Sequence, residues 1–366
     1  MAHETLKSDL LRFSDMKPPV RRAAYSDRTA WLMAVLSELA YLRFDEEDED
    51  AIMSLAVELA KLTDQNSIAE RLRGLALSFS PQRDTKNEIL RSVLAVGGFE
   101  LVGIIFNRET DTQGFVAARR PENDVGMAVI AFRGTQQTKD WMTNLSASAT
   151  GVMHLKNGRE VKVGNVHKGF DAAFKSVEEQ IRSYVEQVAD LPLYITGHSL
   201  GGALATLATW YTSGDKLAAC YSFGAPRCGD DGLVSEFRTP IYRIVNGADP
   251  VPFVPPSSIS IDIAKALLRG IGMFFSPANR LANLVVRSQR FRHYGYQRYL
   301  SICDPAADGT YPDLKNEFGI SSLERIYRYA QRLLRGEAST QRRIDRYHDI
   351  AEYRSKLREF ALRRQT

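Results

Sequence analysis

Cysteine is scarce in this sequence, with only Cys220, Cys228 and Cys303 among 366 residues. These three form no Cys-x-x-Cys pair and no zinc-ligand spacing, so the sequence indicates neither a disulfide framework nor a zinc module. An odd, sparse set is typical of a reducing compartment, or of a fold that does not depend on its thiols. A chain of this length buries enough core to be stable without cross-links or metal.

Long apolar runs are also lacking. No run of about 18 uncharged apolar residues is present, so no membrane-spanning helix is expected. The first residues, MAHETLKSDLLRFSD, contain no apolar h-region, and we therefore expect no secretory signal. We expect a protein that is cytoplasmic or peripheral to a membrane, with export by a route that reads no N-terminal signal left open.

The sequence also lacks a strong excess of charge of one sign, because its net charge is only +4 with 25% charged residues. No tract of Lys and Arg interleaved with aromatics suggests a nucleic-acid fold, so no nucleic-acid partner is expected. The basic excess gathers near the C-terminus, at Arg342, Arg343, Arg346, Arg354, Arg358, Arg363 and Arg364. We interpret this cluster as a solvated helix face. The alternative is attraction to an anionic membrane surface.

What the sequence does contain is a helical N-terminal part followed by a mixed part. Trp31, Val35 and Leu39 recur at helical spacing and predict a helix over residues 26–44. An acidic run at 45–50 follows, which we interpret as a solvated linker. Further helices are predicted at 51–62, 67–79, 170–188 and 200–210, and strands at 101–106, 115–118, 127–132, 191–196, 220–223, 241–245 and 296–302, with Gly114 in the turn between the first two strands.

Strands and helices alternate through the middle of the chain, which indicates βαβ units and a mainly parallel sheet. The expected fold class is therefore α/β, with a mainly parallel central sheet flanked by helices. We divide the chain into an N-terminal helical extension at 1–90 and one large domain at 91–366. That domain carries an insertion at 257–291.

Residues 197–201 read Gly-His-Ser-Leu-Gly, a G-x-S-x-G pattern. Alone it is weak, because roughly one chain in ten of this length would carry it by chance. Its flanks make it specific: an apolar strand at 193–196 runs into it, and a helix of small residues begins at 201. Such a strand-to-helix turn exposes the serine oxygen, and the glycines let helix and strand approach closely. This context favours Ser199 as a nucleophile over an ordinary glycine-rich turn.

A serine nucleophile needs two N–H donors for the oxyanion of its tetrahedral intermediate. One usually belongs to the residue after the nucleophile, here Leu200, and the other to a loop after an earlier strand. Residues 132–135, Phe-Arg-Gly-Thr, end the predicted buried strand at 127–132. We therefore expect Thr135 to be the second donor, although an ordinary Gly-Thr turn is also consistent with this segment alone.

In this fold the acid and the base follow the serine along the chain, in that order. Asp249 follows the predicted strand at 241–245 and precedes a Pro-Val-Pro segment, so its carboxylate lies on a loop at a strand's C-terminal end. Ligand crevices of open α/β sheets lie at that edge. The alternative interpretation is an Asp-Pro turn. We expect Asp249 to orient the catalytic histidine.

The choice of histidine stays open on these grounds. His3, His154 and His167 precede Ser199, and His198 is its neighbour on a turn that points it away from the serine proton. His293 and His348 remain. His293 precedes a predicted strand, His348 lies near the start of the last helix, and either can be a structural histidine.

At these residues the sequence resembles the class 3 lipases, which include the filamentous-fungal triacylglycerol lipases and their plant and bacterial relatives. The resemblance covers about residues 101–357. The motifs that carry it are Phe132-Arg133-Gly134-Thr135 with Asp140-Trp141 and Asn144-Leu145, His167-Lys168-Gly169-Phe170, the elbow at 197–202, Phe223-Gly224-Ala225-Pro226-Arg227, the acid loop at 246–256, and His293-Tyr294-Gly295-Tyr296.

This resemblance implies an α/β-hydrolase fold and a serine hydrolase that cleaves carboxylic esters of lipids through an acyl-enzyme. It implies a triad of Ser199, Asp249 and His348, because the motif around His293 is not catalytic in the family. No metal and no organic cofactor are expected, and the expected partner is a lipid or other ester substrate. The chain departs from the secreted fungal members in its N-terminal helices, its lack of a signal and its insertion after Pro256.

The insertion at 257–291 has apolar residues in two amphipathic stretches, broken at Ser276-Pro277. Lys265, Arg269, Arg280 and Arg287 exclude a transmembrane span. We interpret the segment either as a cap packed on the body or as a lid that contacts a lipid surface. A cap that opens at such a surface would do both.

Two rival functions remain. A phospholipase, lysophospholipase or acyltransferase could use the same triad, and the basic C-terminal residues favour a substrate with an anionic head group. A catalytically silent hydrolase fold could act as a binding module. Such relatives usually lack a triad member, whereas Ser199, Asp249 and His348 are all present here.

Overall fold

The computed structural model describes residues 2–16, 24–42, 87–122, 125–135, 149–156, 159–212, 217–247, 249–255, 291–321, 324, 327 and 346–363. The acidic run at 45–50, the helices expected at 51–62 and 67–79, and residues 257–290 of the insertion lie outside them. So do the motif residues at 140–145.

The centre of the structure is an eight-stranded sheet with the order β1-β2-β3-β6-β7-β8-β9-β10. The inner strands from β3 to β9 pair in parallel, while β1-β2-β3 and β9-β10 pair antiparallel. The strands span Glu100–Asn107 (β1), Thr112–Arg119 (β2), Met127–Phe132 (β3), Leu193–His198 (β6), Leu217–Phe223 (β7), Ile241–Asn246 (β8), Tyr296–Leu300 (β9) and Asn316–Phe318 (β10). This confirms the expected mainly parallel sheet of an α/β fold.

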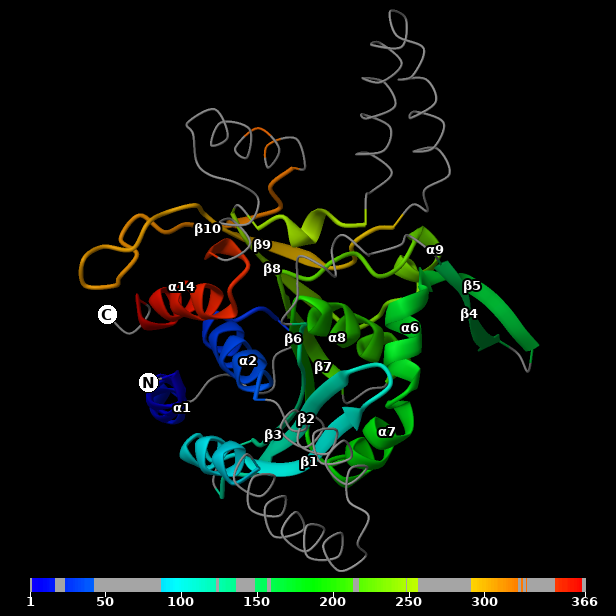
Figure 1. Cartoon of the computed structure of the whole chain (residues 1–366), viewed down its shortest axis with the longest axis horizontal. Coiled ribbons are helices and arrows are strands. Elements are labelled where there is room, and N and C mark those ends of the chain that lie inside the picture. Colours follow the sequence, from blue (N-terminus) through cyan, green and yellow to red (C-terminus); the bar gives the residue numbers. More distant parts are fainter. Residues whose placement is uncertain are drawn as a thin grey trace, which may run out of the picture.

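Helices cover both faces of this sheet (Figure 1). One face carries α1, α2 and α14, and the other carries α6, α7 and α8. Their bounds are Ala2–Met16 (α1), Asp27–Leu39 (α2), Lys168–Lys175 (α6), Glu178–Gln187 (α7), Leu200–Tyr211 (α8) and Ile350–Arg363 (α14). The sheet strands alternate their side chains between the two cores, as in β3, where Val129 faces the α2 side and Ile130 the α8 side.

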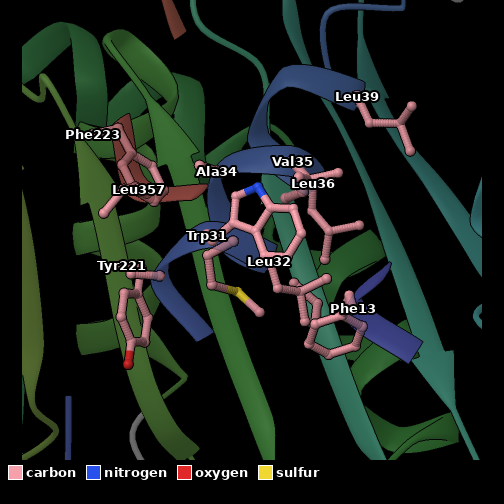
Figure 2. Close-up of a cluster of buried hydrophobic side chains, with 14 of the residues drawn as sticks. Phe13, Trp31, Leu32, Ala34, Val35, Leu36, Leu39, Tyr221, Phe223 and Leu357 are labelled. Atoms are coloured by element: carbon pink, nitrogen blue, oxygen red, sulfur yellow. The ribbon is translucent and has the colours of Figure 1, made fainter. Parts of the chain in front are cut away.

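The N-terminal helix α2 is buried along most of its length, which explains its nearly continuous apolar sequence. Ser26 caps it by accepting a hydrogen bond from the Thr29 N–H. Its apolar side chains pack between the sheet and helices α1 and α14 in Figure 2, which shows Trp31, Leu32, Val35 and Leu36 beside Phe13, Phe223 and Leu357. Ser37 adds a buried hydrogen bond of 2.9 Å to Thr196 in β6.

Residues 87–96 form a further helix, whose Leu90, Val93 and Leu94 pack in the core on the α2 side of the sheet. Strands β4 (Ala149–Lys156) and β5 (Arg159–His167) form a separate antiparallel hairpin. A short helix α9 (Asp231–Val234) and a 3₁₀ helix (Val251–Phe253) lie in the loops after β7 and β8. Among the described residues, no helix has the length and apolar character needed to cross a membrane.

The prediction for Gly114 is wrong. Gly114 lies inside β2, opposite Phe132 of β3, and the turn comes earlier, at residues 108–111. The glycine is needed because the strands approach closely there: a Cβ would meet the Ala131 carbonyl oxygen at 2.5 Å. The helix predicted at 170–188 is in fact two, because the chain turns at Ser176 and Val177 between α6 and α7.

The solvated face expected for the C-terminal arginines also needs correction at Arg354. Its side chain is buried between α14 and the N-terminal helices, where it contacts Asp9 and Glu38 at 2.6 Å each. Arg346 and Arg363 are exposed, as expected, and Arg342, Arg343 and Arg364 lie outside the described residues.

Candidate active site

Ser199 lies on the turn between β6 and α8, in a backbone conformation that side chains rarely adopt. Its φ is +58° and its ψ −128°. Such a conformation costs on the order of 1–3 kcal/mol and persists only where the surroundings impose it. Here the Ser199 N–H donates to the Phe223 carbonyl of β7 at 2.9 Å, and a Cβ at Gly197 would meet the Gly201 carbonyl oxygen at 2.2 Å. The turn is therefore as tight as the glycine spacing predicts.

Asp249 and His348 form a buried pair beyond the ends of the central strands. His348 Nδ1 lies 2.9 Å from Asp249 Oδ2, and the exposed fractions of their side chains are 3% and 0%. The other carboxylate oxygen, Oδ1, accepts from the Val251 N–H at 2.9 Å. A carboxylate in this position holds the imidazole in one orientation, with its Nε2 turned away from the acid.

Two atoms of this site are buried without a hydrogen-bond partner among the described residues: Ser199 Oγ and His348 Nε2. Buried polar atoms are nearly always paired, so an exception suggests a functional reason. These are the two atoms between which a proton passes when a histidine activates a serine.

Gly224 brings the elbow and the acid–base pair together. It follows β7 directly after Phe223, whose carbonyl accepts from Ser199. A Cβ at Gly224 would lie 2.6 Å from Asp249 Oδ2 and 3.0 Å from His348 Nδ1, and its φ of +56° also favours glycine. The pair therefore packs against the main chain beside Ser199, where only a glycine leaves room.

The loop at residues 133–135, which we call the oxyanion loop, passes directly beside Ser199. A Cβ at Gly134 would lie 2.9 Å from the Ser199 Cβ and 2.6 Å from the His198 carbonyl oxygen. Arg133 anchors this loop by an ion pair of 2.7 Å with Asp111. Thr135 is half-buried at the end of the loop, and Leu200 begins α8. Their role as the two oxyanion donors stays a prediction.

The two other histidines weighed for this site have different surroundings. His293 Nε2 lies 2.8 Å from the Pro252 carbonyl, and not against Asp249. His198 lies under His348 with ring centroids 4.5 Å apart, and its Nδ1 contacts the Tyr41 hydroxyl at 2.7 Å. Burial, and next the neighbouring His348, hold the pKa of His198 well below its usual value, so this ring is neutral.

Helix α14 attaches the histidine segment to the acid loop, and the sequence argument missed this function. Tyr353 donates from its hydroxyl to Asp249 Oδ2 at 2.6 Å and accepts from the Asn246 N–H at 2.9 Å. Lys356, fully buried, donates to Asn246 Oδ1 at 2.8 Å. Tyr353 comes five residues after His348, in the helix that begins at Ile350, and no local pattern indicates its contact with Asp249.

The three cysteines, Cys220, Cys228 and Cys303, are all buried and unpaired. Burial raises the pKa values of Cys220 and Cys228 to about 12, so neither thiol ionises at neutral pH. No group of three or more His, Cys, Asp or Glu side chains in the described part of the chain has the arrangement of a metal site.

Part of this chain is similar in sequence to a known protein family. Residues 129–259 match the family model of lipase (class 3). The predicted resemblance to the class 3 lipases is confirmed. The matched segment contains most of β3, the oxyanion loop, the elbow and the acid loop, whereas His348 follows it.

Individual relatives are lipases and a phospholipase. Secreted mono- and diacylglycerol lipase 1 of Fusarium solani is 30% identical over 164 residues, which is 43% of this chain and 46% of that protein. Chloroplastic phospholipase A(1) DAD1 of Arabidopsis thaliana is 32% identical over 168 residues, 39% of this chain and 38% of that one. The chain thus spans less than half the length of these relatives. Lipase II from Rhizopus niveus aligns in structure over 64% of this chain and 76% of its own, with a TM-score of 0.44 and 20% identity.

Proposed function

We propose that this protein is a serine hydrolase that cleaves carboxylic esters of lipids through a triad of Ser199, Asp249 and His348. The observation that carries the proposal is the pair of unpartnered buried atoms, Ser199 Oγ and His348 Nε2. Asp249 is hydrogen-bonded to the other nitrogen of the same imidazole, Nδ1. The match of residues 129–259 to the class 3 lipases supports the same chemistry.

In the proposed reaction, His348 Nε2 accepts the proton of Ser199 as its oxygen attacks the ester carbonyl. Asp249 stabilises the imidazolium that results. The N–H groups of Thr135 and Leu200 bind the oxyanion, His348 returns the proton to the leaving alcohol, and water then releases the acid from the acyl-enzyme. The mechanism requires no metal and no organic cofactor.

The test is fatty-acid release by the wild type, with Ser199→Ala as the blank. Two substrates are compared: a dissolved short-chain ester and a long-chain lipid presented at an interface. The alanine variant should lose turnover on the order of a millionfold. Equal release by both proteins would refute the mechanism. Faster wild-type turnover at the interface identifies a lipase, and activity on the dissolved ester alone identifies a general esterase.

A second candidate, phospholipid hydrolysis by the same triad, is favoured by the similarity to phospholipase A(1) DAD1. An acyltransferase or lysophospholipase would use the same groups. The test presents phosphatidylglycerol vesicles beside neutral lipid. Slower or equal turnover on the anionic vesicles would count against a phospholipase.

Three broader expectations accompany the proposal. The N-terminal helices and the large domain at 91–366 are proposed as the two parts of the chain, with the insertion at 257–291 as a cap or lid. The protein is proposed to work in the cytoplasm or on a membrane surface. A catalytically silent binding module is the remaining alternative, and failure of a serine-directed phosphonate to label Ser199 would favour it.

A further inference from the structure

The hydroxyl of Tyr41 lies where the oxyanion loop meets the elbow. Tyr41 follows α2 on the N-terminal side of the chain, 157 residues before His198. Its oxygen is 2.7 Å from His198 Nδ1, and a Cβ at Gly134 would lie only 2.2 Å from that same oxygen. One hydroxyl from the N-terminal helices thus contacts both segments that border Ser199.

The direction of the hydrogen bond between Tyr41 and His198 follows from the groups involved. Burial raises the pKa of Tyr41 far above its ordinary value, so the phenol keeps its proton. The phenolic proton is then directed to His198 Nδ1. Tyr41 donates to the elbow, and its oxygen packs closely against the Gly134 backbone of the oxyanion loop.

For His198, the consequence is a fixed tautomer. Its Nδ1 accepts from Tyr41, so the single proton of the neutral ring is on Nε2. This neutral ring packs against the His348 ring, with ring centroids 4.5 Å apart. When His348 becomes an imidazolium during the proposed reaction, it faces no second positive charge from its neighbour.

We propose that Tyr41 is a positioning residue for ester hydrolysis: its hydroxyl holds the oxyanion loop against the elbow and keeps His198 as a neutral support for His348. The proposal rests on the proposed function. Tyr41 contacts neither Ser199 nor His348 in the described hydrogen bonds, and it acts through Gly134 and His198.

This role predicts a specific kinetic signature. Oxyanion donors act on the charge that develops in the transition state, and not on the bound substrate. A loop displaced by a fraction of an ångström should therefore lower kcat and leave KM nearly unchanged. We expect Tyr41→Phe to lower kcat about ten- to a hundredfold on a dissolved short-chain ester.

Tyr211→Phe is the matched control. The Tyr211 hydroxyl also donates to one side chain, Asp171, at 2.7 Å, but it lies at the opposite end of α8 from Ser199. This control should lose thermal stability as Tyr41→Phe does while it keeps the wild-type kcat. Equal kcat in Tyr41→Phe and wild type would overturn the proposal. The proposal would also be overturned if kcat fell in both variants in proportion to the drop in their unfolding temperatures.

A second pair of variants tests the His198 branch should Tyr41→Phe fold poorly. The amide oxygen of His198→Asn can accept from Tyr41 near the position of Nδ1, whereas His198→Leu cannot. His198→Asn should keep a kcat at least about tenfold above that of His198→Leu. Equal losses would overturn the proposal. Ser199→Ala in the same assay separates the two questions, because activity that survives there refutes the proposed function and not the role of Tyr41 alone.

Discussion

Tyr353 and His348 donate to the same oxygen of one carboxylate, Asp249 Oδ2, at 2.6 and 2.9 Å. A carboxylate oxygen that accepts two hydrogen bonds shares its charge between them. The Tyr353 hydroxyl therefore weakens the hydrogen bond between Asp249 and the imidazole of His348. The acid of the proposed triad is therefore tuned from the C-terminal helix and not only from its own loop.

Removal of this hydroxyl should slow catalysis. In Tyr353→Phe, Asp249 Oδ2 loses the hydrogen bond that connects it to α14, so the carboxylate holds the imidazole of His348 less well in place. We expect kcat on a dissolved short-chain ester to fall about tenfold. Tyr299→Phe is the control, because its hydroxyl binds the Gly247 carbonyl at 3.1 Å and not Asp249. An unchanged kcat in Tyr353→Phe would contradict this role of the hydroxyl.

Gly224→Ala should disable the acid–base pair. A methyl group there would lie 2.6 Å from Asp249 Oδ2 and 3.0 Å from His348, at a φ of +56°. Gly319→Ala provides a matched control, since Gly319 has the same φ of +56° and no atom within 4 Å of its added Cβ among the described residues. Both variants carry the backbone cost, on the order of 1–2 kcal/mol. Only Gly224→Ala should lose more than about a hundredfold in kcat/KM, and similar losses in the two would show that strain alone is responsible.

The neutral, buried His198 should make the fold sensitive to acid. Burial lowers its pKa in the folded state from an ordinary value of 6.5, so below that pH the unfolded chain binds a proton that the folded chain does not. The free energy of unfolding should fall by up to about 1.4 kcal/mol per pH unit from this residue alone. Urea denaturation between about pH 8 and pH 5 measures the slope. His198→Asn should flatten it, and an unchanged slope would assign the acid sensitivity to other groups.

Arg354→Met should destabilise the protein strongly, because it removes the ion-pair partner of Glu38 and leaves Asp9 with only the longer contact to Arg358 at 3.4 Å. Asp9 is 1% exposed and Glu38 14%, and burial already raises the pKa of Glu38 against the opposing charge of Arg354. Breaking such a buried network costs about 3–5 kcal/mol. Arg120→Met removes an exposed ion pair with Asp190 and should cost less than about 1 kcal/mol. Urea midpoints compare the two, and equal losses would contradict the anchoring role of Arg354.

The elements next to Ser199 could be predicted because their information is local. A buried apolar strand, a glycine-rich turn and a small-residue helix follow one another within residues 193–211, and the structure has β6, the elbow and α8 there. The same holds for β3, whose six residues are all buried and whose predicted bounds are those observed. Hydrophobic periodicity needs no knowledge of distant contacts.

The rest could not be predicted because its information is not local. Tyr41 and Tyr353 reach the site through contacts that span 157 and 104 residues, and no pattern around either residue indicates them. The β4–β5 hairpin could not be predicted because its strands mix apolar with charged residues and lie outside the main sheet. Arg354 looked like a surface charge since its carboxylate partners come from α1 and α2.

The ion pair between Arg354 and Asp9 also affects the order in which the site can form. Its two residues are 345 positions apart, so the helix that carries Tyr353 is anchored to a segment that a ribosome makes long before that helix. Contacts of such long sequence separation form late in folding, because the closure of large loops has to come first. The elbow around Ser199 can form from neighbouring residues, whereas the proposed base, His348, lies next to α14. A nascent chain of this protein would therefore carry Ser199 well before the proposed triad is complete.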